Sequence, residues 1–130
     1  VFQGKTMTQP LALVLYEKLL PGSQLVNRLQ DLNYRVQTLT DPGLLVPCAE
    51  QARPLVVLTD LESTHSDVRS AISRLRQHPA TQHVPVIAFG GEQSLKDSAT
   101  TEAAGVTLVV SDVAVLNHLS ECLQQALEID

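Results

Sequence analysis

Short apolar runs alternate with amphipathic segments along most of this chain. Four runs are almost continuously apolar and a fifth, residues 34–39, alternates between apolar and polar side chains, which is typical of strands in both cases. The other four predicted strands are residues 11–16, 54–61, 85–89 and 106–110. Each run is followed by a segment with apolar residues at helical spacing. The order strand–helix is therefore repeated five times.

Strands that are joined by crossover helices run parallel to one another. Right-handed crossovers place the helices on both faces of the sheet, and nearly continuous apolar strands agree with a sheet that is covered on both faces. The sequence therefore predicts a doubly wound α/β fold, (βα)5, with a five-stranded parallel sheet in the strand order 2-1-3-4-5. In this order the first and last helices share one face and the middle three share the other.

Three of the predicted helices carry signals that a structure can test. In the first, Leu25, Leu29 and Leu32 recur at helical spacing and are expected to face the core. The second is expected to begin at Asp41, an N-cap residue that is followed by proline. The last is predicted as one continuous helix through residues 115–127, because its apolar spacing is unbroken.

Composition and charge argue against two classes of protein, nucleic-acid-binding proteins and membrane-spanning proteins. A chain of 130 residues with 44% hydrophobic residues is expected to form one domain. The net charge of −5 and the scarcity of aromatic residues (two Phe, two Tyr and no Trp) argue against nucleic-acid binding. Because no run of 18 apolar residues occurs, we expect no membrane span and a cytoplasmic location.

The two cysteines and the first residues have simple interpretations. Cys48 is predicted on the second helix and Cys122 on the fifth, on opposite faces of the sheet, so we expect no disulfide between them.

Residues 1–6 (VFQGKT) resemble the remnant of a cleaved purification tag. Met7 is interpreted as the natural start, and residues 7–130 as the domain.

Acidic residues follow the predicted strands at the carboxyl edge of the sheet, where ligands bind in open α/β folds. Glu17 follows the first strand, Asp60 ends the third and Asp112 follows the fifth. Glu17 and Asp60 flank the switch point and are the candidate ligands for a hard cation, Mg²⁺ or Ca²⁺, with Asp112 completing an acidic pocket. Two structural alternatives stay open: Asp112 caps the last helix, and Asp60 bonds backbone N–H groups in its own turn.

Two stretches resemble a bacterial response-regulator receiver domain: PLVVLTDL at 54–61 and RLRQHPATQHVPVIAFG at 74–90. The resemblance covers nearly all of residues 7–130. It implies a flavodoxin-like fold, a place in two-component signal transduction or a phosphorelay without enzymatic activity of its own, and Asp60 as the phosphoacceptor position. It also implies a histidine kinase or another regulatory protein as partner, and a homodimer face made by the fourth helix, fifth strand and fifth helix.

Four positions depart from the receiver pattern. Tyr16 stands where the family has one of two acids that hold Mg²⁺. Gly90 stands at the position of a Thr or Ser that bonds the phosphoryl group, and Val109 at the position of an aromatic switch residue. The place of the family's lysine falls on Asp112 or its neighbour Ser111, so that a cation is missing there.

These departures favour one hypothesis over two others. Phosphoryl transfer depends on positioning and on electrostatic stabilisation of the transferring group, and this chain lacks a hydroxyl and a cation for that task. We therefore predict an atypical receiver-like module, a pseudo-receiver, that acts through protein–protein contact without phosphorylation or a cofactor. The alternatives are a working receiver phosphorylated on Asp60, with Mg²⁺, and a flavodoxin-like binder of a small ligand.

Overall fold

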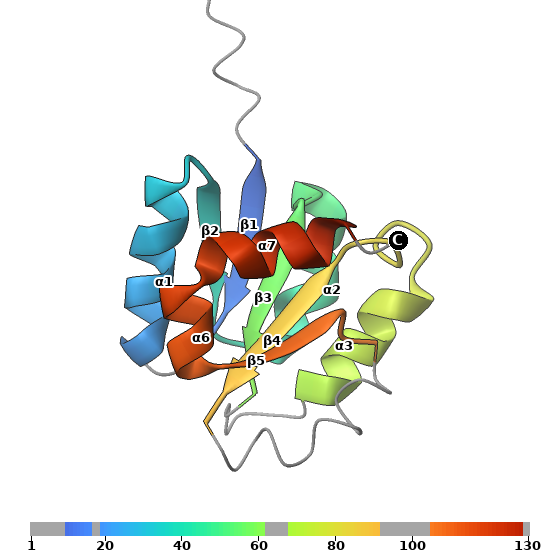
Figure 1. Ribbon diagram of the computed structural model, residues 1–130. Coiled ribbons are helices and arrows are strands. Elements are labelled where there is room, and N and C mark those ends of the chain that lie inside the picture. The colour runs from blue at the N-terminus through green and yellow to red at the C-terminus, as the bar shows by residue number, and fades with distance from the viewer. Residues whose placement is uncertain (1–9, 17–18, 62–67, 92–104, 129–130) are drawn as a thin grey trace, which may run out of the picture.

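The strands form one parallel sheet whose order agrees with the prediction. The computed structural model describes residues 10–16, 19–61, 68–91 and 105–128. The sheet has the order β2-β1-β3-β4-β5, and every neighbouring pair is parallel. Its strands are β1 (Leu11–Leu15), β2 (Arg35–Leu39), β3 (Val56–Asp60), β4 (Val86–Gly90) and β5 (Leu108–Ser111). The predicted doubly wound α/β topology is therefore confirmed (Figure 1).

Helices cover both faces of this sheet. One face carries α1 (Leu19–Asp31), α6 (Asp112–Asn117) and α7 (Leu119–Glu128), and the other carries α2 (Leu45–Ala52) and α3 (Val68–Gln77) (Figure 1). The predicted fourth helix, within residues 93–103, lies outside the described residues.

Two helix boundaries differ from the predictions. The second helical segment begins as a 3-10 turn, Pro42–Leu44, before α2 starts. Asp41 still acts at this start, because its Oδ1 accepts a hydrogen bond from Gly43 N at 2.8 Å. The prediction of one continuous last helix is wrong: the chain leaves helical geometry at His118, with φ −128° and ψ 35°, and α7 begins at the next residue.

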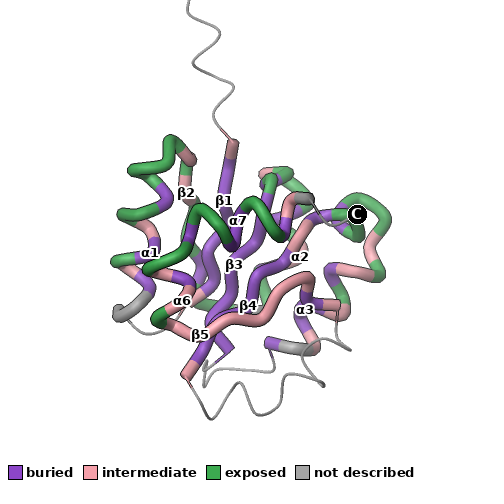
Figure 2. Tube along the Cα trace, in the orientation of Figure 1, coloured by how far each residue is buried: buried purple, intermediate pink, exposed green. Residues whose placement is uncertain are grey.

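The core consists of two clusters, one on each face of the sheet. Strands β1, β3 and β4 are buried along their whole length, because they lie inside the sheet and are covered on both faces (Figure 2). Alternate residues of each strand join opposite clusters, as the pleat requires. On the α1 and α7 side Val14 and Leu58 pack with Phe89, and on the α2 and α3 side Leu13 and Val57 form part of the other cluster.

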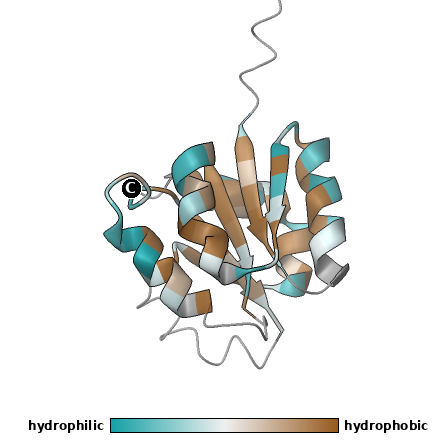
Figure 3. Cartoon of the chain, turned by 180° about the vertical axis from the view of Figure 1, so that it is seen from behind, coloured by the Kyte–Doolittle hydropathy of each residue, from teal (hydrophilic) through white to brown (hydrophobic). Residues whose placement is uncertain are grey.

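The outer surface is more polar than the sheet. In the view from behind, hydrophobic colouring concentrates on the central strands, while the outward sides of the helices carry most of the hydrophilic colouring (Figure 3). Strand β2 lies at one edge of the sheet, and Arg35, Gln37 and Thr38 are exposed there. None of the helices in the described ranges combines the length and the apolar character that a membrane crossing requires.

Arg76 joins α3 to the amino-terminal edge of the sheet. Its Nε donates to Gly105 O at 2.7 Å, its Nη1 to Gln82 O and Val84 O at 2.8 and 2.6 Å, and its Nη2 to Thr107 Oγ1 at 3.1 Å. Burial lowers the pKa of the guanidinium, and the three carbonyls oppose this effect because they accept hydrogen bonds from the cation. One side chain thus joins α3 to the nearby residues 82–84 and to the distant residues 105–107.

The cysteines lie where the topology predicts. Cys48 packs against the cluster on the α2 and α3 side, and Cys122 belongs to the cluster on the α1 and α7 side. Both are free thiols.

Candidate functional site

Asp60 is the central residue at the carboxyl edge of the sheet. It is the last residue of β3, with β1 on one side and β4 on the other, and its strand partner in β4 is Phe89. The ladder continues one residue further, since Leu61 N donates to Phe89 O at 2.9 Å. Asp60 is only 2% exposed, so this conformation shields its carboxylate from solvent. The sequence therefore placed this acid at the correct edge, and the structure adds that it is buried.

Tyr16, directly after β1, contributes an aromatic ring where the family has an acid. The ring lies against Gly22 in α1 so closely that a β-carbon on Gly22 would overlap ring atoms Cδ2, Cε2 and Cγ. Tyr16 is half-buried and packs on the cluster that contains Phe89. The residue is thus part of the packing between β1 and α1 and supplies no carboxylate to the edge.

Gly90 and Ser111 lie opposite each other at the ends of β4 and β5. Gly90 is buried and has no side chain to offer a phosphoryl oxygen. The Ser111 hydroxyl accepts a hydrogen bond from Ala114 N at 3.0 Å and so caps the N-terminus of α6. The hypothesis that Asp112 is the cap is therefore wrong, because Ser111 has the extended backbone geometry of an N-cap and Asp112 is already the first helical residue.

Asp112 nevertheless remains next to the carboxyl edge. It is half-buried, with its Oδ1 atom shielded from solvent. A carboxylate in the first turn of a helix interacts favourably with the helix dipole. This local role is favourable for an acid at Asp112, which with its neighbour Ser111 is the place where the receiver pattern has a lysine.

Val109, at the position of the aromatic switch residue, pairs with Ala88 of β4. It packs against the cluster on the α2 and α3 side as a partly buried aliphatic side chain. A valine has neither the size nor the hydroxyl of a tyrosine, so it cannot make the large outward and inward rotation that an aromatic switch uses.

A magnesium ion requires several oxygen ligands, usually with two or more from the protein. Of the predicted ligands, Asp60 is described and Glu17 lies outside the described residues. Within the described ranges no group of three or more His, Cys, Asp or Glu residues is arranged to hold a metal ion. Because Tyr16 turns its ring onto Gly22, the described residues do not fit the acid pair of the family, and we derive no step through a metal.

Two features of this region, the helix cap and the close approach at a glycine, could have been recognised in the sequence. Ser111 is three residues before Ala114 at a strand-to-helix junction, which is the spacing of an N-cap hydrogen bond. Gly22 lies early in α1, where alanine would be the better helix former. A glycine at such a position indicates close approach of another group, and here that group is the Tyr16 ring.

Comparison of the structure with solved structures finds the same fold in receiver domains. The receiver domain of a sensor histidine kinase from Pseudomonas aeruginosa PAO1, with a magnesium ion coordinated in its active-site cleft, matches with a TM-score of 0.82 and 22% identity over 92% of this chain and 98% of that chain. The chemotaxis protein CheY4 of Vibrio cholerae matches with a TM-score of 0.82 and 19% identity, over 92% and 99% of the two chains.

A third match extends the range of proteins that carry this fold. The signal receiver domain of a modulated diguanylate cyclase from Desulfovibrio desulfuricans G20 has a TM-score of 0.77 and 19% identity, over 92% of this chain and 94% of that chain. No protein-family model matches the sequence, and no curated protein matches it significantly. The chain therefore has the fold of response-regulator receiver domains.

Proposed function

We propose that this chain, which has the fold of response-regulator receiver domains, is a receiver-like signalling module that acts through protein–protein contact without phosphorylation of Asp60. The observation that carries the proposal is the composition of the edge around Asp60. Gly90 stands where the receiver pattern has a hydroxyl donor, and Asp112 or its neighbour Ser111 stands where that pattern has a cation. The module itself would perform no catalysis and require no cofactor.

The physical chemistry of phosphoryl transfer supports this proposal. The transferring group spreads negative charge over its oxygens, and proteins accelerate the step with donors and cations already in position. Removing one such donor costs about 3 to 4 kcal/mol of transition-state stabilisation. In this chain one donor and one cation are missing, and the carboxylate of Asp112 would repel the incoming group.

The burial of Asp60 gives independent support. A residue that is 2% exposed does not present its carboxylate to a donor in solution. The working-receiver alternative therefore requires the residues around Asp60 to move before transfer, and afterwards it requires a readout that Gly90 and Val109 do not provide.

We place the partner-binding surface of this module on the face predicted from the receiver family. Its described part is the outer side of residues 111–125, and its other part, residues 93–104, lies outside the described residues. Val113, in the first turn of α6, is 66% exposed and supplies an apolar contact there. The proposed partner is a histidine kinase or another regulatory protein of the same signalling system.

The test is exposure of the purified chain to acetyl phosphate or beryllofluoride in the presence of Mg²⁺. We expect no phosphoryl adduct by intact mass spectrometry and no NMR shift changes in Leu58 to Leu61. A stoichiometric adduct that is lost in an Asp60→Asn variant would establish the working receiver instead.

A second measurement addresses the contact function. The wild-type chain and an Asp60→Ala variant are used to recover partners from cells of the source organism, with quantification by mass spectrometry. Equal recovery of the same signalling protein by both chains is expected. Recovery that depends on Asp60 would contradict the proposal, provided that circular dichroism shows both chains to be folded.

A further inference from the structure

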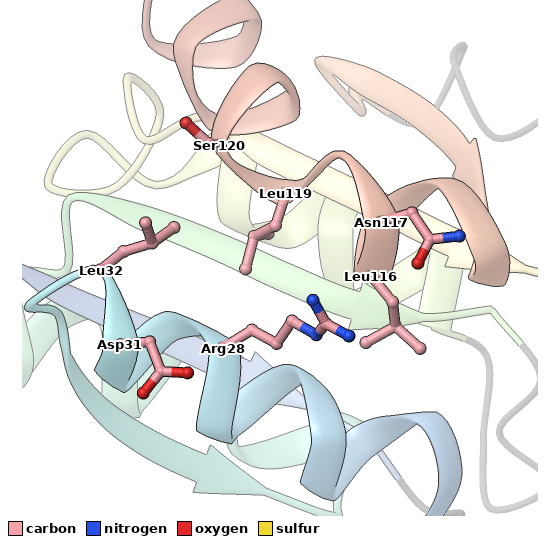
Figure 4. A pocket seen from close by; sticks show the side chains of 7 residues that line it. All are labelled: Arg28, Asp31, Leu32, Leu116, Asn117, Leu119 and Ser120. Carbon is pink, nitrogen blue, oxygen red and sulfur yellow. The ribbon is translucent and has the colours of Figure 1, made fainter.

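Two cavities in the described part of the molecule differ in their place and their lining. The groove of about 210 Å³ between α1 and the α6–α7 junction (Figure 4) is lined in part by Leu116 and Ser120, which belong to the partner face proposed above. The second cavity, of about 270 Å³, is lined by Arg53, Pro54, Pro79, Ala80, His83 and Val84. It shares no residue with the partner face or with the edge around Asp60.

The second cavity lies at the amino-terminal edge of the sheet. Its lining comes from the connection between α2 and β3 and from the connection between α3 and β4. The two connections lead into neighbouring strands, and Val57 N donates to Pro85 O at 2.9 Å where these strands begin. Because Asp60 is the last residue of β3, the cavity and the candidate phosphoacceptor lie at opposite ends of the same strand.

His78 fixes one wall of this cavity. Its Nδ1 accepts a hydrogen bond from Ala80 N at 3.2 Å, and its Nε2 lies 3.3 Å from Glu50 Oε2. Since Nδ1 is the acceptor, the proton of the neutral ring is on Nε2, which donates it to the Glu50 carboxylate. The start of the α3–β4 connection is thereby tied to α2, and Glu50 already has a partner.

Arg53 has a backbone conformation that favours glycine. It is the C-cap residue of α2, with φ 51° and ψ 60° in the left-handed region. Among the described residues the other non-glycine residue with positive φ is Asn33, and asparagine tolerates this region better than most residues. Glycine is the usual residue at such a helix end. An arginine there carries a conformational cost, which indicates a use for its side chain.

Arg53 and His83 bring hydrogen-bond donors to a cavity whose other walls are largely apolar. Both residues are exposed, and within the described ranges neither side chain has an ion pair or a hydrogen bond. Pro54, Pro79 and Val84 supply apolar surface. A guanidinium binds a carboxylate through two parallel hydrogen bonds, and apolar walls with a few polar groups are typical of small-molecule sites.

We propose that this cavity binds a small monocarboxylate with an apolar body. Arg53 donates to the carboxylate, His83 donates through a ring N–H, and the apolar body covers Pro54 and Val84. The volume of about 270 Å³ is close to the lower limit of about 300 Å³ for small-molecule sites, so the ligand is small. The site does not involve Asp60, and the proposal is therefore independent of phosphorylation there.

The local charge favours a carboxylate over a phosphate. The helices α2 and α3 both end at this edge, and the carbonyl end of a helix carries a partial negative charge. Arg53 is the one lining residue with a permanent positive charge. A single negative charge on the ligand matches this balance better than the double charge of a phosphate monoester.

An NMR titration with benzoate tests the site. Benzoate is expected to shift the amide signals of Arg53, Ala80, His83 and Val84, with a dissociation constant of about 1 to 10 mM for a ligand of this size. Benzamide has the same ring without the charge, and phenyl phosphate has the ring with a second charge. Each is expected to bind at least about tenfold more weakly than benzoate.

Two substitutions separate binding from stability. Glycine suits the left-handed backbone, so Arg53→Gly should leave the urea midpoint of unfolding unchanged or higher, while the affinity for benzoate falls by at least about tenfold. His83→Ala should lower the affinity by about threefold, because one hydrogen bond is lost. Arg74→Gln, an exposed change on α3, is the matched control and should alter neither quantity.

Three results would overturn the proposal. The first is the absence of shifts in these four amides up to about 50 mM benzoate. The second is binding of benzamide or phenyl phosphate that is as tight as that of benzoate. The third is wild-type affinity for benzoate in the folded Arg53→Gly variant, because the carboxylate would then bind without the guanidinium.

Discussion

The ring of Tyr16 occupies the space that a side chain at Gly22 would need, so the residue after β1 and the fourth residue of α1 determine each other. The receiver pattern has an acid in place of Tyr16, and an acid would leave this space open. The substitution therefore changes packing as well as charge. It ties the end of β1 to α1 at the edge where Asp60 lies.

This contact predicts that Gly22→Ala changes the free energy of unfolding in opposite directions with and without the Tyr16 ring. In the wild-type chain, Gly22→Ala should lower the free energy of unfolding by about 1 to 3 kcal/mol, because the added methyl group collides with the ring. In a Tyr16→Ala background the same change should raise it by about 1 kcal/mol, since alanine is the better helix former. Urea denaturation of the wild type, the two single variants and the double variant measures both effects. Ser23→Ala is the control in the same helix. Equal effects of Gly22→Ala in both backgrounds would show that the ring does not fill this space in solution.

The hydrogen bonds of Arg76 predict that a positive charge alone is not sufficient at this position. Arg76→Lys keeps the charge but cannot reproduce the four hydrogen bonds made by the guanidinium. We expect a loss of about 2 to 3 kcal/mol in the free energy of unfolding, because partly buried carbonyl groups lose their donors. Arg74→Lys, an exposed change on the same helix, should cost less than about 0.5 kcal/mol. If both changes cost the same, the hydrogen bonds of Arg76 do not anchor α3.

Gly105 provides a second test of the same anchor. Its φ of +117° lies in a region that other residues rarely adopt, and a β-carbon there would overlap Arg76 Cγ. Gly105→Ala is therefore expected to destabilise the protein by at least about 1 kcal/mol. In an Arg76→Ala background the steric part of this cost disappears and the backbone part remains, which a double-mutant cycle resolves.

The two thiols should differ in reactivity. Burial raises the pKa of the Cys122 thiol, and the Glu121 carboxylate raises it further. Because the thiolate is the reactive form, Cys122 should react more slowly than the half-buried Cys48 near pH 8, and its rate should keep rising as the pH approaches the raised pKa. Ellman's reagent applied to Cys48→Ser and Cys122→Ser variants measures each thiol separately. Glu121→Gln should speed the reaction of Cys122, and no change would remove this charge as a cause.

Restoring the missing groups should restore chemistry at Asp60. A triple variant, Tyr16→Asp/Gly90→Thr/Asp112→Lys, returns an acid, a hydroxyl and a cation to the carboxyl edge. With acetyl phosphate and Mg²⁺, each restored donor or cation is expected to raise the rate of adduct formation by about a hundredfold or more. Intact mass spectrometry detects the adduct.

One control and one stability measurement accompany this variant. Adding Asp60→Asn should abolish the adduct, and an adduct that persists would place phosphorylation on another residue. The lysine also places a cation in the first turn of α6, where it opposes the helix dipole and should cost about 0.3 to 1 kcal/mol of stability. A triple variant that is folded but gains no adduct would mean that burial of Asp60, rather than the missing groups, prevents the transfer.

The strand order and the place of Asp60 could be predicted because they depend on burial along whole elements. Strands such as Val56–Asp60 are covered on both faces, and nearly continuous apolar sequence records that directly. An acid at the end of such a strand can only lie at the carboxyl edge. These features follow from the average environment of several residues and need no knowledge of single contacts.

The features that were not predicted depend on single contacts. The apolar spacing of residues 115–127 continues through His118, so periodicity alone gives no sign that the helix is interrupted there. Leu32 follows the spacing of Leu25 and Leu29, but α1 ends at Asp31, and Leu32 is therefore exposed. The direction of the Tyr16 ring depends on the open space above Gly22. A glycine early in a helix indicates that another group approaches closely, but the sequence does not say which residue it is.

Strand β2 has a consequence for how copies of this chain meet in solution. The free edge of a sheet is a template on which strands of other molecules can add, and exposed charged and polar side chains oppose this. Arg35, Gln37 and Thr38 place such side chains along β2. The β2 edge is thereby protected against runaway strand addition and fibril growth.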